Sequence, residues 1–162
     1  MEIYCLAIGK RLRLPSKKME ELSLLAVLHD IGKIGVNPDI LQKPGPLTPF
    51  EWVEMKRHPE IGYRIAQMTP ELAEVADPIL SHHERWDGKG YPRGLAGEDI
   101  PLTCRILAVA DAYDAMTNNR IYRDAMDRGQ AASELQINAG TQFDPEIADL
   151  FIEMINETEP QV

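Results

Sequence analysis

The stretch LSLLAVLHDIGKIG, residues 22–35, decides the fold, because its apolar helical pattern ends on a histidine and an aspartate. Leu22, Leu25 and His29 follow the i, i+3, i+7 spacing of one buried helical stripe, so a histidine stands where a further leucine is expected. Asp30 follows directly, and an ionised aspartate beside so apolar a helix is unfavourable by several kcal/mol if it has no partner. The pair indicates either a hydrogen-bonded helix end or a set of metal ligands.

Helix start and stop signals divide the rest of the chain. Ser16 can cap a helix that runs through Leu28, and the sequence TPFE at residues 48–51 is a capping box with proline at the first helical position. Glycine- and proline-rich turns lie between the helical stretches, and alternating strand patterns are nearly absent. The sequence therefore predicts an all-α fold of roughly seven helices. We also expect one long Gly/Pro-rich loop near residues 85–101, and a loop of that length in a compact domain is usually functional.

Length and composition favour one globular domain in a reducing compartment. The chain has 162 residues, 44% of them apolar and 27% charged, which suits a folded domain with its own core. Its longest apolar runs, residues 24–28 and 106–110, are far shorter than the roughly 20 residues of a membrane span. Two cysteines, Cys5 and Cys104, make no disulfide framework. We expect a cytoplasmic domain without membrane contact.

The negative charge is concentrated near the carboxyl end. The chain carries 26 acidic and 17 basic side chains, a formal net charge of −9. Residues 124–162 hold nine acids and one base, a charge of −8, which leaves −1 for residues 1–123. An acidic surface repels polymeric nucleic acid, so long DNA or RNA is excluded as a partner. The rest of the chain is neutral enough to bind a small anionic ligand.

The remaining histidines and one further aspartate also depart from a plain helical core. His82 and His83 follow an apolar run and precede the glycine-rich loop, and His58 precedes a proline. Asp111 lies among small apolar helical neighbours, where either an arginine or a metal could neutralise it. Four histidines and two aspartates favour a divalent metal in octahedral geometry over a tetrahedral structural zinc, and six ligands suit two metal ions bridged by a carboxylate. The candidate ligands are His29, Asp30, His58, His82, His83 and Asp111.

Several motifs together resemble the HD-GYP domain family of cyclic di-GMP phosphodiesterases, within the HD superfamily of metal-dependent phosphohydrolases. The resemblance covers nearly the whole chain in the family's order, and it implies an HD-domain helical bundle over residues 1–157 with a C-terminal tail at residues 158–162. The motifs are HDIGKIG at residues 29–35, HHERWDGKGYP at residues 82–92, ILAVADAYDAMT at residues 106–117 and GTQFDP at residues 140–145.

The resemblance implies a metal-dependent phosphodiesterase that hydrolyses the bacterial second messenger cyclic di-GMP to pGpG, GMP or both. A hydroxide activated by two metal ions would attack the phosphodiester, with iron or manganese favoured over nickel, zinc or magnesium. The six candidate ligands would hold the metals, and Asp30 would bridge them. The other residues that the resemblance assigns are Lys33 beside the scissile phosphate, Gly90, Tyr91 and Pro92 along the substrate groove, and Arg120 and Arg123 on phosphate.

The resemblance also carries one departure. Family members usually hold a further histidine ligand on the first helix, and its position would fall just upstream of Met1. We therefore expect the chain to start inside that helix, and a non-catalytic module that binds a cyclic dinucleotide or a partner domain is the alternative. A general nucleotide phosphohydrolase of the wider superfamily is a third interpretation. The family implies an upstream receiver, sensory or cyclase domain, and a homodimer is compatible with it.

Simpler structural roles stay open for several of these residues. Lys33 could interact with carbonyl groups at a helix end, and the two arginines could pair with nearby aspartates. Trp86 and Tyr91 could anchor the loop on the core. Phe50 and Trp52, near a helix start, are interpreted as packing residues.

Overall fold

The computed structural model describes residues 1–119 and 125–157, and this part of the chain is all-helical, as the sequence predicts. The predicted loop is confirmed, since only a short 3-10 turn interrupts the irregular chain between Ser81 and Leu102. In the described ranges, no helix has both the length and the apolar character needed to cross a bilayer. The α-helices are α1 (Glu2–Arg11), α2 (Ser16–Leu28), α3 (Pro38–Leu41), α4 (Pro49–Met55), α5 (His58–Gln67), α6 (Ala76–Ser81), α7 (Leu102–Thr117), α8 (Arg128–Ile137) and α9 (Pro145–Glu157), and the 3-10 helices are η1 (Ile31–Gly35), η2 (Pro70–Val75) and η3 (Gly97–Asp99).

These nine α-helices of the described residues exceed the expected seven. Short helices account for the difference, because the four residues of α3 and the six of α6 carry too little periodic pattern to be recognised in a sequence. The capping box is confirmed: the Thr48 hydroxyl accepts from the Glu51 N–H at 3.3 Å, and the Glu51 carboxylate accepts from the Thr48 N–H at 2.7 Å. The prediction for Ser16 is wrong, since α2 already includes Ser16 and the extended Pro15 takes the capping position.

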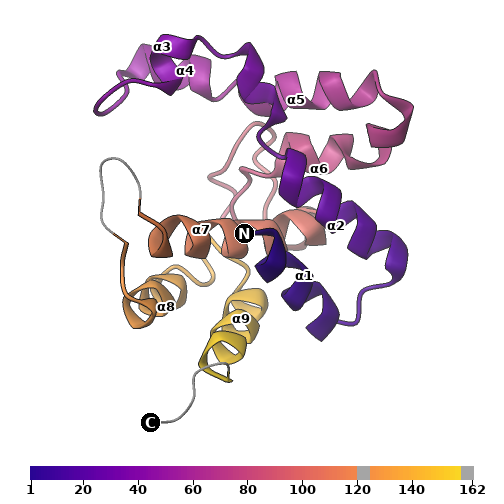
Figure 1. Ribbon diagram of the computed structural model, residues 1–162, viewed down its shortest axis with the longest axis vertical. Coiled ribbons are helices and arrows are strands. Elements are labelled where there is room, and N and C mark those ends of the chain that lie inside the picture. Colours follow the sequence, from indigo (N-terminus) through magenta and orange to yellow (C-terminus); the bar gives the residue numbers. More distant parts are fainter. Residues whose placement is uncertain (120–124, 158–162) are drawn as a thin grey trace.

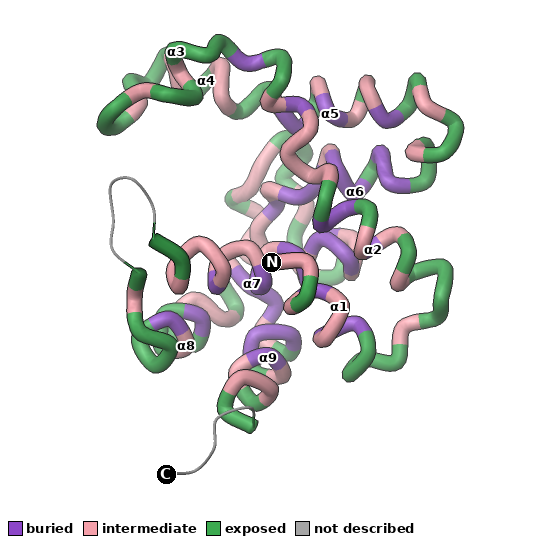
Figure 2. Tube along the Cα trace, viewed as in Figure 1, coloured by how far each residue is buried: buried purple, intermediate pink, exposed green. Residues whose placement is uncertain are grey.

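Helix α7 lies at the centre of the molecule and packs against α1, α2, α6, α8 and α9 (Figure 1). Several of its apolar side chains are buried, and Tyr113 forms edge-to-face ring contacts with Tyr4 of α1 at 5.4 Å and with Phe151 of α9 at 5.0 Å between centroids. Burial is uneven (Figure 2), because α3 and α4 contain no buried residue. The α3–α4 segment therefore stands away from this core.

The turn after α2 is pressed against the start of α5. A methyl group added to Gly32 of η1 would lie 1.9 Å from the His58 carbonyl oxygen and 2.5 Å from the Gly62 amide nitrogen. Only glycine permits so close an approach between two backbones. This contact fixes the chain around Asp30 relative to His58.

Gly32→Ala should strongly destabilise the protein, because the clash is with backbone that cannot turn away. We expect the free energy of unfolding to fall by about 3 kcal/mol or more in denaturant titration. Gly35→Ala in the same 3-10 helix is the matched control, since its added methyl group meets the Ile61 side chain at 3.0 Å, which can adjust. Equal losses for the two variants would contradict the proposed role of the backbone contact.

Candidate metal centre

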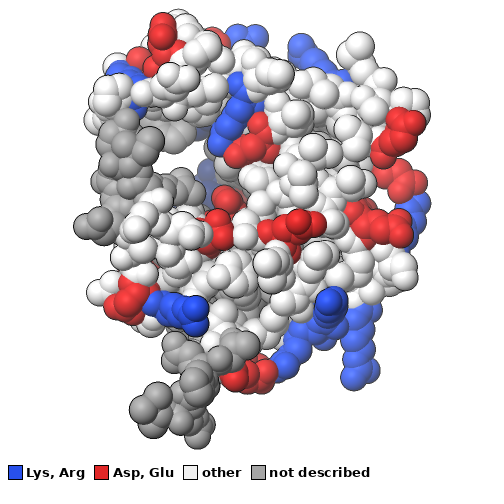
Figure 3. Space-filling view, in the orientation of Figure 1, with Lys and Arg blue, Asp and Glu red and all other residues white. Residues whose placement is uncertain are grey.

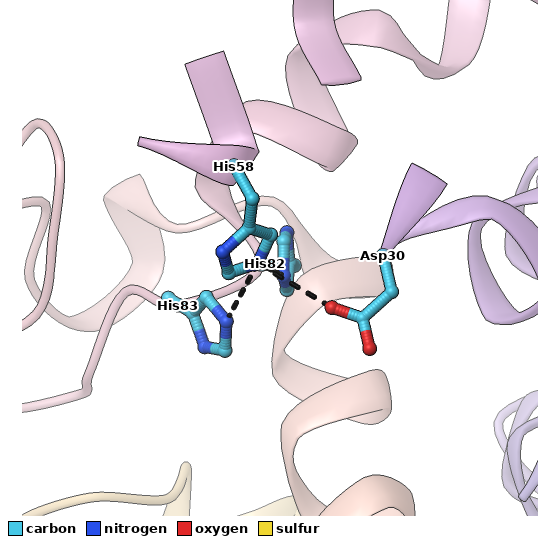
Figure 4. Close-up of side chains that lie close together, drawn as sticks. All are labelled: Asp30, His58, His82 and His83. Carbon is cyan, nitrogen blue, oxygen red and sulfur yellow. Dashed lines mark hydrogen bonds and ion pairs between the residues drawn. The ribbon is translucent and has the colours of Figure 1, made fainter. Parts of the chain in front are cut away.

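Four side chains from three separate segments converge on one point. Asp30 follows the end of α2, His58 begins α5, and His82 and His83 follow α6. One ligand atom of each lies within 4.8 Å of the others (Figure 4). The His58 Nε2 atom is 3.2 Å from His82 Nε2, 3.1 Å from His83 Nε2 and 3.4 Å from Asp30 Oδ1.

Hydrogen bonds on the far side of two rings define what faces this point. The Nδ1 atom of His58 lies 2.7 Å from the Met55 carbonyl oxygen, and the Nδ1 atom of His82 lies 2.6 Å from the Ile79 carbonyl oxygen. A carbonyl oxygen only accepts, so Nδ1 carries the proton in the neutral rings and Nε2 presents a lone pair. Two lone pairs therefore face each other across 3.2 Å. A cation between them removes this repulsion, and backbone carbonyls that orient histidine rings are typical of metal sites.

The donor set suits a divalent metal ion. Imidazole nitrogens and a carboxylate oxygen bind iron, manganese, nickel or zinc, and the cluster contains no thiolate. Electrostatics also favour a metal ion at this cluster, because buried charges in proteins are either paired or bound to metals. Asp30, His58, His82 and His83 could thus hold a metal ion.

His29 and Asp111, the other two expected ligands, border this cluster. The Nε2 atom of His29 lies 3.4 Å from Asp30 Oδ2, its ring centroid lies 5.3 Å from that of His82, and its Nδ1 lies 3.1 Å from the Ala26 carbonyl oxygen. Asp111 lines a cavity of about 300 Å³ together with His82 and His83. The structure thus brings four of the six predicted ligands within reach of one another and puts two beside them.

Burial keeps three of the imidazoles neutral. Desolvation lowers the pKa of His58, lowers that of His82 well below its ordinary value, and lowers that of His83 to about 3. For His29, burial lowers the pKa, but the Asp30 carboxylate outweighs this effect and the net pKa is raised. Neutral imidazole is the form that binds a metal ion, so three of the rings stay competent at neutral pH.

Asp30 has a cationic neighbour. The Lys33 ammonium lies 2.6 Å from Asp30 Oδ2, one turn further along the chain. Burial alone raises the pKa of the Asp30 carboxyl, but hydrogen bonds from His29 and Lys33 outweigh it and hold that pKa below its usual range. Asp30 is therefore ionised, and its ion pair holds Lys33 beside the cluster.

A groove of about 960 Å³ opens over the cluster and is lined by Lys33, Trp52, Lys56, His58, His83 and Tyr91, among others. Arg85 and Lys89 also line it, and none of the described residues along it is acidic. Figure 3 shows the molecule hollowed between the α3–α4 segment and α7. The groove thus offers four cationic side chains next to a candidate metal site, in a protein whose net charge is −9.

Two of the three residues of the Gly-Tyr-Pro motif, Gly90 and Tyr91, line the groove, and the third does not. Tyr91 lines the groove, and its ring stacks on His83 with 4.9 Å between centroids. A methyl group on Gly90 would lie 2.4 Å from the Arg85 amide nitrogen, so the loop closes this tightly only with glycine. Pro92 instead lines a separate cavity of about 320 Å³. Burial raises the pKa of Tyr91 to about 12, so its hydroxyl stays neutral and can serve as an anchor.

Glu84 organises this loop, a role that the sequence analysis missed. Its carboxylate is 5% exposed and accepts hydrogen bonds from the backbone N–H groups of Arg93 at 2.7 Å, Gly94 at 3.1 Å and Leu95 at 3.1 Å. The sequence does contain a sign of this role, namely an acidic residue that directly follows the two histidines and precedes the glycine-rich loop. A buried carboxylate there needs several donors, and the loop backbone supplies them.

Further contacts brace the loop against the GTQFDP segment. The Trp86 N–H donates to the Gln142 carbonyl at 3.2 Å and the Asp87 N–H to the Thr141 carbonyl at 2.8 Å. Arg120 and Arg123, the two expected phosphate contacts, lie outside the described residues, as does the expected tail at residues 158–162.

The chain matches known proteins over most of its length. Residues 1–147 match the family described as the HD domain. A cyclic di-GMP phosphodiesterase of Thermotoga maritima is 45% identical over 139 residues, which cover 85% of this chain and 38% of that protein. The 3'3'-cGAMP-specific phosphodiesterase 2 of Vibrio cholerae is 37% identical over 157 residues, 96% of this chain and 30% of that protein. The chain thus spans about a third of the length of these curated relatives.

A solved structure shows the same fold. Bd1817, an HDG"Y"P protein from Bdellovibrio bacteriovorus, superposes with a TM-score of 0.73 at 22% identity, over 96% of this chain and 50% of that chain. This likeness confirms the expected helical bundle.

Glu84→Ala should loosen the loop, because three backbone N–H groups lose a charged acceptor. We expect the free energy of unfolding to fall by at least about 2 kcal/mol. Amide hydrogen exchange of Arg93, Gly94 and Leu95 should accelerate. Glu98→Ala removes an equal charge from an exposed position in the same loop and is the control. Unchanged exchange in Glu84→Ala would refute this role.

Acidification should destabilise the protein in the absence of metal. The folded state keeps His83 neutral down to a pKa of about 3, whereas the unfolded chain takes up a proton near its ordinary value of 6.5, so stability is lost as the pH falls through that interval. The lowered pKa values of His58 and His82 act in the same direction, and the raised pKa of His29 opposes them. The lowered pKa of Asp30 contributes only below its ordinary value of 3.8. Urea unfolding with a chelator at about pH 7.5 and about pH 5 measures the difference, which His83→Asn should reduce. Equal stability at both pH values would contradict the assignment.

Proposed function

The chain belongs to the HD domain family, and on that premise we propose that it is a metal-dependent phosphodiesterase that hydrolyses cyclic di-GMP to pGpG, GMP or both. The observation that carries the proposal is the convergence of Asp30, His58, His82 and His83 beneath a groove lined by cationic side chains. Relatives named as phosphodiesterases of cyclic di-GMP and of cGAMP point to cyclic dinucleotides as the substrate class.

Asp30, His58, His82 and His83 would hold a first divalent metal ion, and His29 and Asp111 would extend the set toward a second. We propose iron or manganese, with nickel, zinc or magnesium as alternatives. Such ions neutralise the charge of a phosphodiester and make hydroxide available near neutral pH. This chemistry needs the imidazoles neutral and the carboxylate ionised, and the lowered pKa values of His83 and Asp30 meet that condition.

The side chains of the groove have roles of their own. The Lys33 ammonium, held beside Asp30, would offset the charge that develops on the scissile phosphate. As the bond from phosphorus to the attacking oxygen forms and the bond to the ribose oxygen breaks, Lys33 would donate a proton to that leaving oxygen. Lys89 and Arg85 also line the groove and would contribute positive charge toward the second phosphate, although the Arg85 guanidinium already donates to the Asp87 carboxylate at 3.0 and 3.1 Å. Arg120 and Arg123 stay predicted phosphate contacts.

The wider setting of the domain is also part of the proposal. We propose that residues 1–157 form one catalytic unit that works in the cytoplasm and is controlled by an upstream receiver, sensory or cyclase domain. Signalling input would reach the groove through the helices, and a homodimer is compatible with that arrangement.

Metal content and turnover test the proposal together. The chain reconstituted with manganese should bind at least about one ion and hydrolyse cyclic di-GMP. Asp30→Ala and His58→Ala should each lower metal affinity and turnover by about 100-fold or more, because they remove an atom of the cluster. Elemental analysis by mass spectrometry and chromatography of the products give the two readouts.

Asp39→Ala is the control, since Asp39 is exposed on α3 away from the cluster and should leave both quantities unchanged. Wild-type turnover in Asp30→Ala would overturn the mechanism. Full metal occupancy without turnover in the wild type would instead favour the alternative, a module that binds the dinucleotide without cleaving it.

A further inference from the structure

The large apolar side chains of α4 are exposed and do not pack on the core. Phe50 is 75% exposed, Trp52 48% and Val53 61%, and no residue of α4 is buried. The interpretation of Phe50 and Trp52 as packing residues is therefore wrong, because the α3–α4 segment stands away from the helical core. An exposed tryptophan that lines a groove calls for another explanation.

Polar contacts at the start of α4, rather than burial against the core, hold this helix in its conformation. The capping box of Thr48 and Glu51 fixes the first turn, and the Lys43 ammonium lies 2.6 Å from the Glu51 carboxylate. The helix can therefore present an apolar face to solvent without losing its conformation. Trp52 and Val53 of that face line the groove, whereas Phe50 does not.

The groove has two chemically different walls. The histidines and the cationic side chains described above form a polar wall. The apolar wall consists of Leu47, Pro49, Trp52 and Val53. A phosphate group alone would use only the first. A dinucleotide also carries flat, largely apolar bases, which match the second.

Trp52 is better placed to stack on a base than the other aromatic residue of the groove. The Tyr91 ring already stacks on His83 and has the Lys56 ammonium 5.2 Å from its centroid. Within residues 1–119 and 125–157, no aromatic ring or cationic group packs on the indole of Trp52. The exposed part of the indole can therefore accept a base without displacing an aromatic or cationic neighbour among the described residues.

We propose that the apolar wall of α4 is the nucleobase subsite of the groove, and that Trp52 stacks on a purine of the cyclic dinucleotide. This inference rests on the proposed function and adds the residue that recognises the base. Stacking contributes equally in the ground state and the transition state, so Trp52 lowers KM and leaves kcat unchanged.

Steady-state kinetics of the manganese-loaded chain with cyclic di-GMP provide the test. Trp52→Ala should raise KM by about 5- to 150-fold with little change in kcat, the range expected for one base stacked on an aromatic ring. Trp52→Phe should restore most of the affinity, whereas Trp52→Leu should not. Phe50→Ala is the matched control, because it removes a more exposed aromatic side chain from the same helix outside the groove.

Two inhibitors separate base recognition from phosphate recognition. Trp52→Ala should raise the inhibition constant of GMP and leave that of inorganic phosphate unchanged. Binding can also be followed directly, since the chain has only two tryptophans and the ligand should quench the emission of Trp52. In Trp52→Phe, the quenching that remains comes from Trp86.

Unchanged KM in Trp52→Ala would overturn the inference, and so would equal losses in Phe50→Ala or a parallel rise in the inhibition constant of phosphate. If the wild type cleaves no cyclic dinucleotide, the proposed function fails, and the quenching experiment with cyclic di-GMP still decides whether Trp52 contacts a base.

Discussion

The candidate site depends on how closely three segments of the chain approach one another. Gly32 of η1 faces the His58 carbonyl oxygen, and Gly62 of α5 lies between Gly32 and Ile79 of α6, where an added methyl group would be 2.8 Å from the Ile79 side chain. A methyl group added at Gly32 clashes with backbone, and one added at Gly62 crowds the Ile79 side chain. Because Asp30, His58 and the His82–His83 pair extend from the ends of these same segments, their separation determines whether the four side chains can meet. The close packing of these segments therefore also determines the geometry of the cluster.

The electrostatics of the site follow from its burial. Two lone pairs of buried imidazoles that face one another repel unless a cation lies between them. Burial lowers the pKa of these rings, so protonation does not relieve the repulsion. Asp30 supplies a negative charge, and Lys33 partly balances it. The cluster has the charge and protonation that a divalent ion requires, and the cationic groove above it suits an anionic substrate.

Some residues of the loop at residues 82–101 hold its backbone in place, and others contact the candidate site. The Glu84 carboxylate accepts hydrogen bonds from the backbone of residues 93–95, and the backbone N–H groups of Trp86 and Asp87 donate to the carbonyls of residues 142 and 141. Tyr91 is thereby fixed against His83, which explains how a segment without regular structure can keep one conformation beside the site. The α3–α4 segment differs, since caps and the Lys43–Glu51 ion pair hold it and its apolar face borders the groove.

The sequence by itself determined the helical fold, the capping box at Thr48 and the identity of the unusual polar residues, because each is written in local spacing or in residues that a core does not tolerate. It suggested that His29, Asp30, His58, His82, His83 and Asp111 belong together, but periodicity carries no information on distance between segments far apart in the chain. Tertiary structure alone decided that four of them share one point, that Glu84 organises the loop, and that Pro92 turns away from the groove. It also decided that Trp52 is exposed, since a tryptophan at a helix start has the same sequence pattern whether that helix packs on a core or stands beside a groove.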